Sequence, residues 1–472
     1  MLDYKLKIGI LPIRRYIKEP PKRIGIFQSD YAVDNKKQCV PFIKQHFSDE
    51  QTTFVDIDFL NDDGLLYLES DCDKVAEYFK RREIDALIII NCNFGQETCA
   101  GLVAKKLKVP TLLWGPRDRN FTANIRYTDT QCGLFAISKQ LRRNGVKFSY
   151  IENCDLGDRK FMDGMQKFLR VATMVRNFKD MRILQVGTRI KPFKSIIYNE
   201  LELCEKFGVD ITPVNLADAV QDLTRIYDEQ QPQLNKDLKW LKETYDCGTL
   251  DDVYLKKMLA IVYYYKELAE KNNCNIISSE CWTGITVGWG ANPCLAMSIL
   301  ADQGVYVTCE WDIHMTITNI LLLSATRGKG VPIQGEFTCR HPENDNAELL
   351  WHCGPFALSA KAEGEKPYLY NTKPSFRLAD GEYTIARFQA DAGKYYLFCD
   401  KFTTTDGPKT FGTYMWAQFK NLPALERKLI EGPYIHHMSE IRGDYTAELK
   451  EFAKYIDEII FDGAEDKNAG RI

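Results

Sequence analysis

The strongest constraint on the fold is an alternation of short apolar runs with helix-like segments through the first two thirds of the chain. Leu6–Pro12, Ala86–Ile90 and Val109–Trp114 are mainly apolar, as strands are, and Ala86–Ile90 is also rich in β-branched residues. Helical spacing separates them, as at Val75–Arg82 and Thr98–Leu107. A run that is apolar at every position is typical of a strand buried on both faces of a parallel sheet. The pattern therefore predicts βαβ units and a parallel α/β architecture.

A second series of the same kind begins at Arg182–Val186 and continues to Met315–Ser324. After Gly328-Lys329-Gly330 the pattern changes to consecutive strand-like runs with little helical spacing, which indicates an antiparallel sheet or barrel. We therefore predict an α/β protein with two doubly wound parallel-sheet domains and a C-terminal antiparallel, β-rich, barrel-like domain. The predicted domains are 1–175 (N-terminal α/β), 176–328 (central α/β, with carboxylate ligands) and 329–472 (C-terminal β-rich, with histidine ligands).

Composition and the chain ends narrow the class of protein. Lys and Arg number 62 against 65 Asp and Glu, a balance that argues against a general nucleic-acid binder. The longest apolar runs, such as Ile320–Leu323, are far shorter than the roughly 20 residues that span a bilayer. Asp3 and the absence of a long apolar h-region after it argue against a secretory signal. The 15 cysteines form no C-x-x-C pair, so we expect free thiols, mostly buried, in a cytoplasmic protein without nucleic-acid or membrane partners.

Acidic side chains follow two of the predicted strands in the second series. Glu280 comes directly after the strand Asn275–Ser278, and Glu310 and Asp312 follow the strand Val305–Cys309. Ligands of open parallel sheets bind beyond the carboxyl ends of the strands, so these three acids are candidates for a site. Glu310 and Asp312 can each also be explained by a purely structural role. Asp312 can cap the helix that follows it, and Glu310 can be a solvated loop residue.

Three of the six histidines fall in two C-terminal segments, Leu350–Gly354 and Gly432–His437. His352 lies at the end of an apolar strand, where it is either a hydrogen-bonded core residue or a ligand. His436 and His437 are adjacent, so in an extended segment they point to opposite faces and at most one enters a site; the alternative is a surface loop. Carboxylates together with imidazoles suit Mn²⁺ and, less selectively, Fe²⁺, Co²⁺ or Zn²⁺.

At these residues the sequence resembles the L-fucose and L-arabinose isomerase superfamily, and in architecture the resemblance covers essentially the whole chain. Ser279-Glu280-Cys281 is similar to the glutamate that follows a strand in arabinose isomerases, and Cys309-Glu310-Trp311-Asp312 to their A-E-G-D-like segment. Trp351-His352-Cys353 and His436-His437 are similar to the family's later histidines. Many relatives carry Cys-Trp-Pro-Glu where this chain has Cys281-Trp282-Thr283-Gly284. The missing glutamate leaves open a shifted ligand, an altered substrate or lost activity.

The resemblance implies aldose–ketose isomerisation of a free C5 or C6 sugar, fucose- or arabinose-like, through an enediol. It implies Mn²⁺ or another divalent cation as cofactor and a homo-oligomer, a trimer or hexamer. The acids Glu280, Glu310 and Asp312 would move the proton. The implied metal ligands are Glu280, Glu310, Asp312, His352, His436 and His437. Because the fucose-type branch uses Asp as its second carboxylate, the choice between Glu310 and Asp312 stays open.

Substrate contacts are predicted by location alone, in loops that follow strands. The candidates are Asn93, Gln96, Arg117, Arg189 and Trp282. A hydride shift would use the same catalytic residues as proton transfer, so the sequence does not separate the two. Two other functions stay open. A non-catalytic or regulatory sugar-binding protein on this scaffold would bind sugar without turnover, and a hydrolase would use Glu280 and Glu310 as an acid/base pair without metal.

Overall fold

The computed structural model describes residues 1–472 except 17–26, 28, 120–125, 180 and 467–472. The chain divides into two compact units. One unit is Tyr4–Arg176, and the other is Asn177–Ile472 together with Met1–Asp3. Both units contain a parallel sheet, and the second also contains the β-rich sheet.

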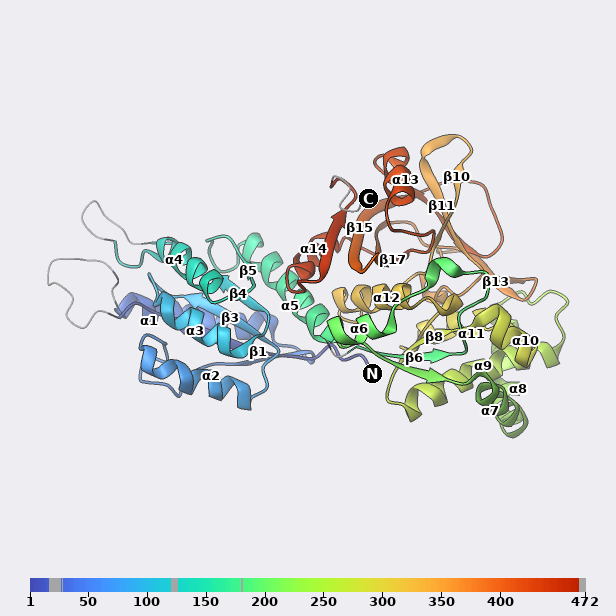
Figure 1. Cartoon of the computed structure of the whole chain (residues 1–472), viewed down its shortest axis with the longest axis horizontal. Coiled ribbons are helices and arrows are strands. Elements are labelled where there is room, and N and C mark those ends of the chain that lie inside the picture. The colour runs from blue at the N-terminus through green and yellow to red at the C-terminus, as the bar shows by residue number, and fades with distance from the viewer. Residues whose placement is uncertain (17–26, 28, 120–125, 180, 467–472) are drawn as a thin grey trace. The chain divides into compact units, whose positions relative to one another are not determined.

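The unit Tyr4–Arg176 is a five-stranded parallel sheet in the order β2-β1-β3-β4-β5, covered by helices on both faces (Figure 1). Its strands are β1 Leu6–Ile13, β2 Thr52–Val55, β3 Ala86–Asn91, β4 Thr111–Trp114 and β5 Phe148–Tyr150. Its helices are α1 Ser29–Phe47, α2 Cys72–Arg81, α3 Glu97–Leu107, α4 Thr130–Arg143 and α5 Arg159–Lys179, the last of which runs on into the second unit. Side chains of α1 and α5 share one core with the sheet, and those of α2, α3 and α4 share the core on its other face. Every residue of β3 is buried, as expected for a central parallel strand.

The second unit begins with a four-stranded parallel sheet in the order β7-β6-β8-β9. Its strands are β6 Arg182–Val186, β7 Asp210–Val214, β8 Ile276–Ser279 and β9 Tyr306–Thr308. The accompanying helices are α6 Glu200–Phe207, α7 Leu216–Glu229, α8 Gln231–Thr244, α9 Asp252–Lys271, α10 Thr286–Trp289, α11 Cys294–Ala301 and α12 Ile313–Ala325. The carboxyl ends of β8 and β9 lie side by side because these two strands pair in parallel.

The C-terminal part is a nine-stranded, mainly antiparallel sheet whose principal order is β10-β11-β16-β15-β14-β17. Its strands are β10 Glu336–His341, β11 Asn344–His352, β12 Tyr368–Tyr370, β13 Lys373–Arg377, β14 Glu382–Asp391, β15 Lys394–Thr405, β16 Thr413–Gln418, β17 Ser439–Arg442 and β18 Ile459–Gly463. The helices are α13 Leu422–Glu431 and α14 Thr446–Ala453. Only β13 with β16 and β15 with β18 pair in parallel among the described strands of this sheet. The predicted fold class, two parallel α/β sheets followed by an antiparallel β-rich part, is confirmed.

Helix α12 joins the two sheets of the second unit. All 13 of its residues are buried, because it packs against β8 and β9 on one side and β14 and β17 on the other. Asn319 donates from Nδ2 to the Thr308 hydroxyl at 3.2 Å, and the Phe388 backbone N–H donates to the Thr318 hydroxyl at 2.9 Å. The helix therefore fixes the end of β9 relative to the β-rich sheet, and the candidate site lies at that junction.

Taken one at a time, the described apolar helices do not meet the length and composition criteria of a membrane span. Within the described ranges, no single helix combines the length and apolar composition of a membrane span. The bent pair Cys281–Trp289 and Cys294–Ala301 meets the criterion only when its two parts are counted together.

Candidate metal centre and active site

Glu310 lies in a strained turn at the carboxyl end of β9. The short 3₁₀ turn Cys309–Trp311 holds Glu310 and Trp311 at φ of 63° and 64°, a left-handed conformation that costs a non-glycine residue about 1–3 kcal/mol. The Cys309 N–H donates to Gln334 Oε1 at 2.8 Å, and Trp311 Nε1 donates to the Gly187 carbonyl at 3.2 Å. These contacts hold a turn that aims the Glu310 carboxylate into the protein, where the residue is 7% exposed.

Two carboxylates and two imidazoles converge at this turn. His437 Nε2 lies 3.1 Å from Glu310 Oε2 and 3.6 Å from Glu336 Oε1, and His352 Nε2 lies 3.5 Å from Glu336 Oε1. Glu310 Oε2, His352 Nε2 and His437 Nε2 are buried without a hydrogen bond of acceptable geometry. Buried polar atoms without partners are costly, and three such atoms close to the Glu336 carboxylate are the arrangement that a cation satisfies. The mixed oxygen and nitrogen set suits a divalent ion of the Mn²⁺, Fe²⁺, Co²⁺ or Zn²⁺ type.

Asp312 orients His437 and is held by Arg387. Its Oδ2 lies 2.9 Å from His437 Nδ1, and its two oxygens accept from Arg387 at 2.8 and 3.1 Å. Oδ1 also accepts from the Met315 N–H at 2.9 Å, so Asp312 caps α12. Burial opposes ionisation of Asp312, but Arg387 and His437 outweigh it and hold the pKa of this carboxyl well below its usual range. An imidazole bonded through Nδ1 to a carboxylate presents Nε2 as a ligand atom, so Asp312 supports the centre from behind His437.

The pKa values of His437, His352 and Glu336 depend on burial and on the charged groups beside them. Burial opposes protonation of His437, yet Asp312 and Glu310 raise its pKa to about 9. Burial likewise opposes protonation of His352, while Cys353 and Glu336 raise its pKa to about 10. Burial also raises the pKa of Glu336. Without a cation, the imidazoles therefore carry protons that a bound cation would displace.

Glu280 is occupied by hydrogen bonds of its own. Its Oε2 accepts from the Thr188 N–H and its Oε1 from the Thr283 hydroxyl, both at 2.8 Å. Gly187 and Gly284 lie so close that a Cβ on either would approach the Glu280 side chain at 2.6–3.0 Å. Within the described residues, the groups of converging donor atoms include neither Glu280 nor Asp312.

The two adjacent histidines differ in environment. His437 is fully buried at the cluster, whereas His436 lines the pocket above it, with ring centroids 4.4 Å from His437 and 6.3 Å from Phe193. Nitrogen atoms of both histidines lie within ligand reach of Glu336. Burial, followed by the charge of His437, lowers the pKa of His436 to about 4, so this ring is neutral near neutral pH.

A pocket of about 340 Å³ opens onto Glu310, Glu336 and His352. Trp282 lines it and donates from Nε1 to Glu310 Oε1 at 3.2 Å. Lys373 also lines the pocket and adds a cationic side chain. The Arg189 guanidinium donates to backbone carbonyls, including that of Phe193 at 3.0 Å. It therefore holds the loop that carries Phe193, whose aromatic ring lines the pocket.

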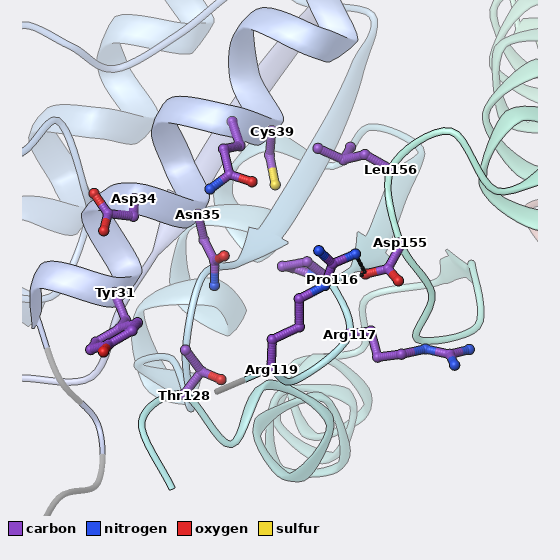
Figure 2. Close-up of a pocket in the computed structure, with 11 residues that line it drawn as sticks. Tyr31, Asp34, Asn35, Cys39, Pro116, Arg117, Arg119, Thr128, Asp155 and Leu156 are labelled. Atoms are coloured by element: carbon purple, nitrogen blue, oxygen red, sulfur yellow. Dashed lines mark hydrogen bonds and ion pairs between the residues drawn. The ribbon is translucent and has the colours of Figure 1, made fainter. Parts of the chain in front are cut away.

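Three predicted substrate contacts lie in the unit Tyr4–Arg176. Asn93 is buried, and its Oδ1 accepts from the Arg15 N–H at 2.8 Å, while Gln96 Oε1 accepts from Arg15 at 3.4 Å. Arg117 follows β4 and lines a polar pocket of about 450 Å³ (Figure 2). In that view Arg119 meets Asp155, at 2.8 Å, while Arg117 points away from the side chains of α1.

Glu336 and Arg387 are the members of the site that sequence reasoning did not nominate. Glu336 opens β10, and backbone pairing sets it opposite Trp351 in β11 and bridges it to His437. Arg387 is fully buried in the middle of β14. A charge inside an otherwise apolar strand run is a signal that could have marked Arg387, because a buried charge needs a partner. Glu336 gives no comparable signal, since it stands at the start of a strand.

Comparisons with known proteins identify sequences similar to this chain. Residues 21–179 match the family model described as fucose/sulfoquinovose isomerase, N-terminal domain. A sulfoquinovose isomerase of Alkalicoccus urumqiensis is 23% identical over 386 residues, covering 78% of this chain and 84% of the relative. Sulfoquinovose isomerases of Priestia aryabhattai and Priestia megaterium are each 22% identical over 387 residues, covering 80% of this chain and 85% of the relative. The resemblance inferred from the sequence is thus supported as one to a fucose isomerase-like superfamily.

Replacing Arg387 by Met should destabilise the chain by about 3–5 kcal/mol, because it leaves the buried Asp312 carboxylate without its cation. The control Arg427→Met removes an exposed ion pair on α13 and should cost less than about 1 kcal/mol. Urea unfolding of the full-length variants measures both. Equal shifts for the two variants would contradict a supporting role for the Asp312–Arg387 pair.

Mn²⁺ affinity should rise with pH between about pH 6 and 9, by up to tenfold per pH unit for each histidine that loses a proton. The reason is that the raised pKa values of His437 and His352 make the proton a competitor of the cation at and below neutral pH. Calorimetric titration in buffers of different ionisation enthalpy counts the released protons. The exposed-site variant His46→Gln should behave as the unsubstituted chain does; binding with no proton release would refute the assignment.

Proposed function

We propose, on the premise of the fucose isomerase-like superfamily that these matches support, that this chain is a metal-dependent aldose–ketose isomerase. The observation that carries the proposal is the convergence of Glu310 Oε2, Glu336 Oε1, His352 Nε2 and His437 Nε2. Three of these four residues, all except His437, line a pocket. Three of these atoms are buried without a hydrogen bond. The similarity to proteins named sulfoquinovose isomerases supports a sugar isomerase in general, without specifying its substrate.

Glu310, Glu336, His352 and His437 would hold the divalent cation, with Mn²⁺ as the proposed ion. When bound, such a cation supplies Lewis-acid stabilisation of the negative charge that develops on the sugar's carbonyl and hydroxyl oxygens. Asp312 and Arg387 keep His437 in the required orientation. Trp282 holds the second oxygen of Glu310 from the pocket side.

Glu336 is the proposed proton carrier. Burial raises its pKa toward the working range of a general acid and base, and its side chain is 18% exposed toward the pocket. Glu336 takes the proton from C2 of the open-chain aldose, a double bond forms between C1 and C2, and the same carboxyl returns the proton to C1. The O2 hydroxyl proton passes to O1, so no proton is gained or lost. A hydride shift from C2 to C1 is the alternative at the same residues.

The proposed substrate is a free sugar with an anionic substituent. The names of the relatives point to sulfoquinovose, a sugar sulfonate, rather than to fucose or arabinose. Lys373 and the neutral side chain of Asn292 line the same pocket as Glu310, Glu336 and His352. A cationic side chain in the lining of the pocket is the feature that an anionic sugar requires and a neutral sugar does not.

Other expectations stay predictions: a trimeric or hexameric homo-oligomer, a cytoplasmic location, and no nucleic-acid or membrane partner. A non-catalytic sugar-binding protein would keep the pocket without turnover. The hydrolase alternative needs Glu280 as an acid or base, but both oxygens of Glu280 already accept hydrogen bonds from Thr188 and Thr283. The isomerase is therefore the better-supported function.

Glu336→Gln should lower kcat by about 10²–10⁴-fold, because the amide cannot take the C2 proton. The matched control is Glu343→Gln, an exposed glutamate in the turn between β10 and β11, which should keep full activity. Kinetics with Mn²⁺ over sulfoquinovose, fucose, arabinose and glucose measure the effect. In deuterium oxide, proton transfer places solvent deuterium at C1 of the product.

Full activity of Glu336→Gln would remove Glu336 from the proton transfer. Product formed in deuterium oxide without any deuterium at C1 would favour the hydride shift. Sugar binding without turnover on any of these sugars, with or without Mn²⁺, would support the non-catalytic alternative.

Lys373→Met should raise KM for sulfoquinovose by about tenfold or more, the loss of one charge-assisted contact of about 1.5–3 kcal/mol. KM for a neutral sugar that the enzyme turns over should change little. Lys409→Met, at an exposed site, is the control. An equal effect of Lys373→Met on charged and neutral sugars would mean that Lys373 shapes the pocket rather than reads the charge.

A further inference from the structure

A row of four thiols lies beside the carboxylate and imidazole group. Cys309 Sγ is 3.2 Å from Cys281 Sγ, and Cys294 Sγ is 3.6 Å from Cys353 Sγ. Donor atoms of Cys309, Cys353 and His352 all lie within 4.8 Å of one another, which links the two pairs. All four cysteines are free thiols.

The spacing of these sulfur atoms is that of ligands to one ion. Two sulfurs bound to a tetrahedral zinc at about 2.3 Å lie about 3.8 Å apart. The separations of 3.2 and 3.6 Å, and the group within 4.8 Å, lie close to that value. They are much longer than the roughly 2.05 Å of a disulfide.

The chemistry of this donor set differs from that of its neighbour. Thiolates with an imidazole are soft ligands that select zinc-class and softer ions, whereas the set with Glu310 and Glu336 is dominated by oxygen and suits harder ions such as Mn²⁺. The two sets meet at His352, which belongs to a converging group in each of them. The Cys353 backbone N–H donates to His352 Nδ1 at 2.8 Å, so both sets depend on the remaining nitrogen, Nε2, which cannot bind two ions at once.

Solvent ions can reach the thiols through the pocket. Cys281, Cys294 and Cys353 line the same pocket of about 340 Å³ that opens onto Glu310. Cys309 is buried behind them. An ion that enters the pocket therefore has access to these three thiols as well as to Glu310 and Glu336.

We propose a second cation site, for a thiophilic ion of the zinc and cadmium class, formed by Cys309, Cys353 and His352. Cys281 and Cys294 stand within reach to complete it. Each thiol that binds the ion releases one proton to solvent, and no electron is transferred. Occupancy withdraws His352 from the neighbouring set, so the site is inhibitory. The inhibition rests on the proposed isomerase function, but the binding does not.

The test is a titration of the reduced full-length protein with Cd²⁺ in saturating Mn²⁺. Thiolate-to-cadmium charge-transfer absorption in the ultraviolet reports binding, and isomerase activity is followed in parallel. The variant Cys309→Ser/Cys353→Ser removes two ligands. Cys132→Ser/Cys204→Ser, which replaces two exposed cysteines outside the cluster, is the matched control. Thermal unfolding and Mn²⁺ binding of each variant establish that it is folded.

We expect an absorption that saturates at one cadmium per chain, with affinity at least about 100-fold weaker in the cluster variant and unchanged in the control. Independently of any variant, bound Cd²⁺ should protect Cys353 of the unsubstituted protein from alkylation, read by peptide mass spectrometry. Equal cadmium absorption in the folded cluster variant, or no protection of Cys353, would overturn the site. Binding without loss of activity would leave the site standing and refute the inhibition.

Discussion

The structure of the site depends on a buried ion pair between Asp312 and Arg387. Both side chains are fully buried, and the pair sits where α12 begins, between the parallel sheet and β14. A buried pair is stable only when its remaining donors and acceptors are satisfied, and here they are, by His437, the Met315 N–H and Gln389. The same contacts that satisfy Asp312 therefore position His437. The contacts that stabilise the buried ion pair are thus the same contacts that set the orientation of His437 as a ligand.

The fold was predictable because its signals are local. A run such as Ala86–Ile90 is apolar at each position, so its place inside a parallel sheet follows from the sequence itself. The rule that ligands bind beyond the carboxyl ends of parallel strands also selects candidates from the sequence, among them Glu310 and Asp312. It could not separate their roles, since one is turned inward by a left-handed turn and the other caps a helix.

Glu336 shows why the rest of the site was out of reach. Its position depends on the register between β10 and β11 and on a bridge to the segment before β17, which are contacts between parts of the chain far apart in sequence. Nothing in the residues around Glu336 encodes that register. His352 and His437 were nominated individually, but their convergence on Glu336 comes only from the pairing of strands. The buried charge of Arg387 was the one further signal available in the sequence.

Two donor sets of different hardness share His352, and this gives the site its character. Glu310 and Glu336 line the pocket together with Lys373 and Trp282, and the thiols of Cys281, Cys294 and Cys353 line the same pocket. A site with oxygen and sulfur ligands side by side responds strongly to which cation is present. If both proposed sites bind their ions, activity would depend on which cation is supplied as well as on the substrate.

The most direct test of the central claim is an anomalous diffraction measurement on crystals grown with Mn²⁺, at the manganese absorption edge. The account predicts one strong peak in each chain, bounded by Glu310, Glu336, His352 and His437, with Asp312 and Arg387 outside the coordination shell. A peak at Glu280, or ordered manganese only at surface carboxylates, would contradict it.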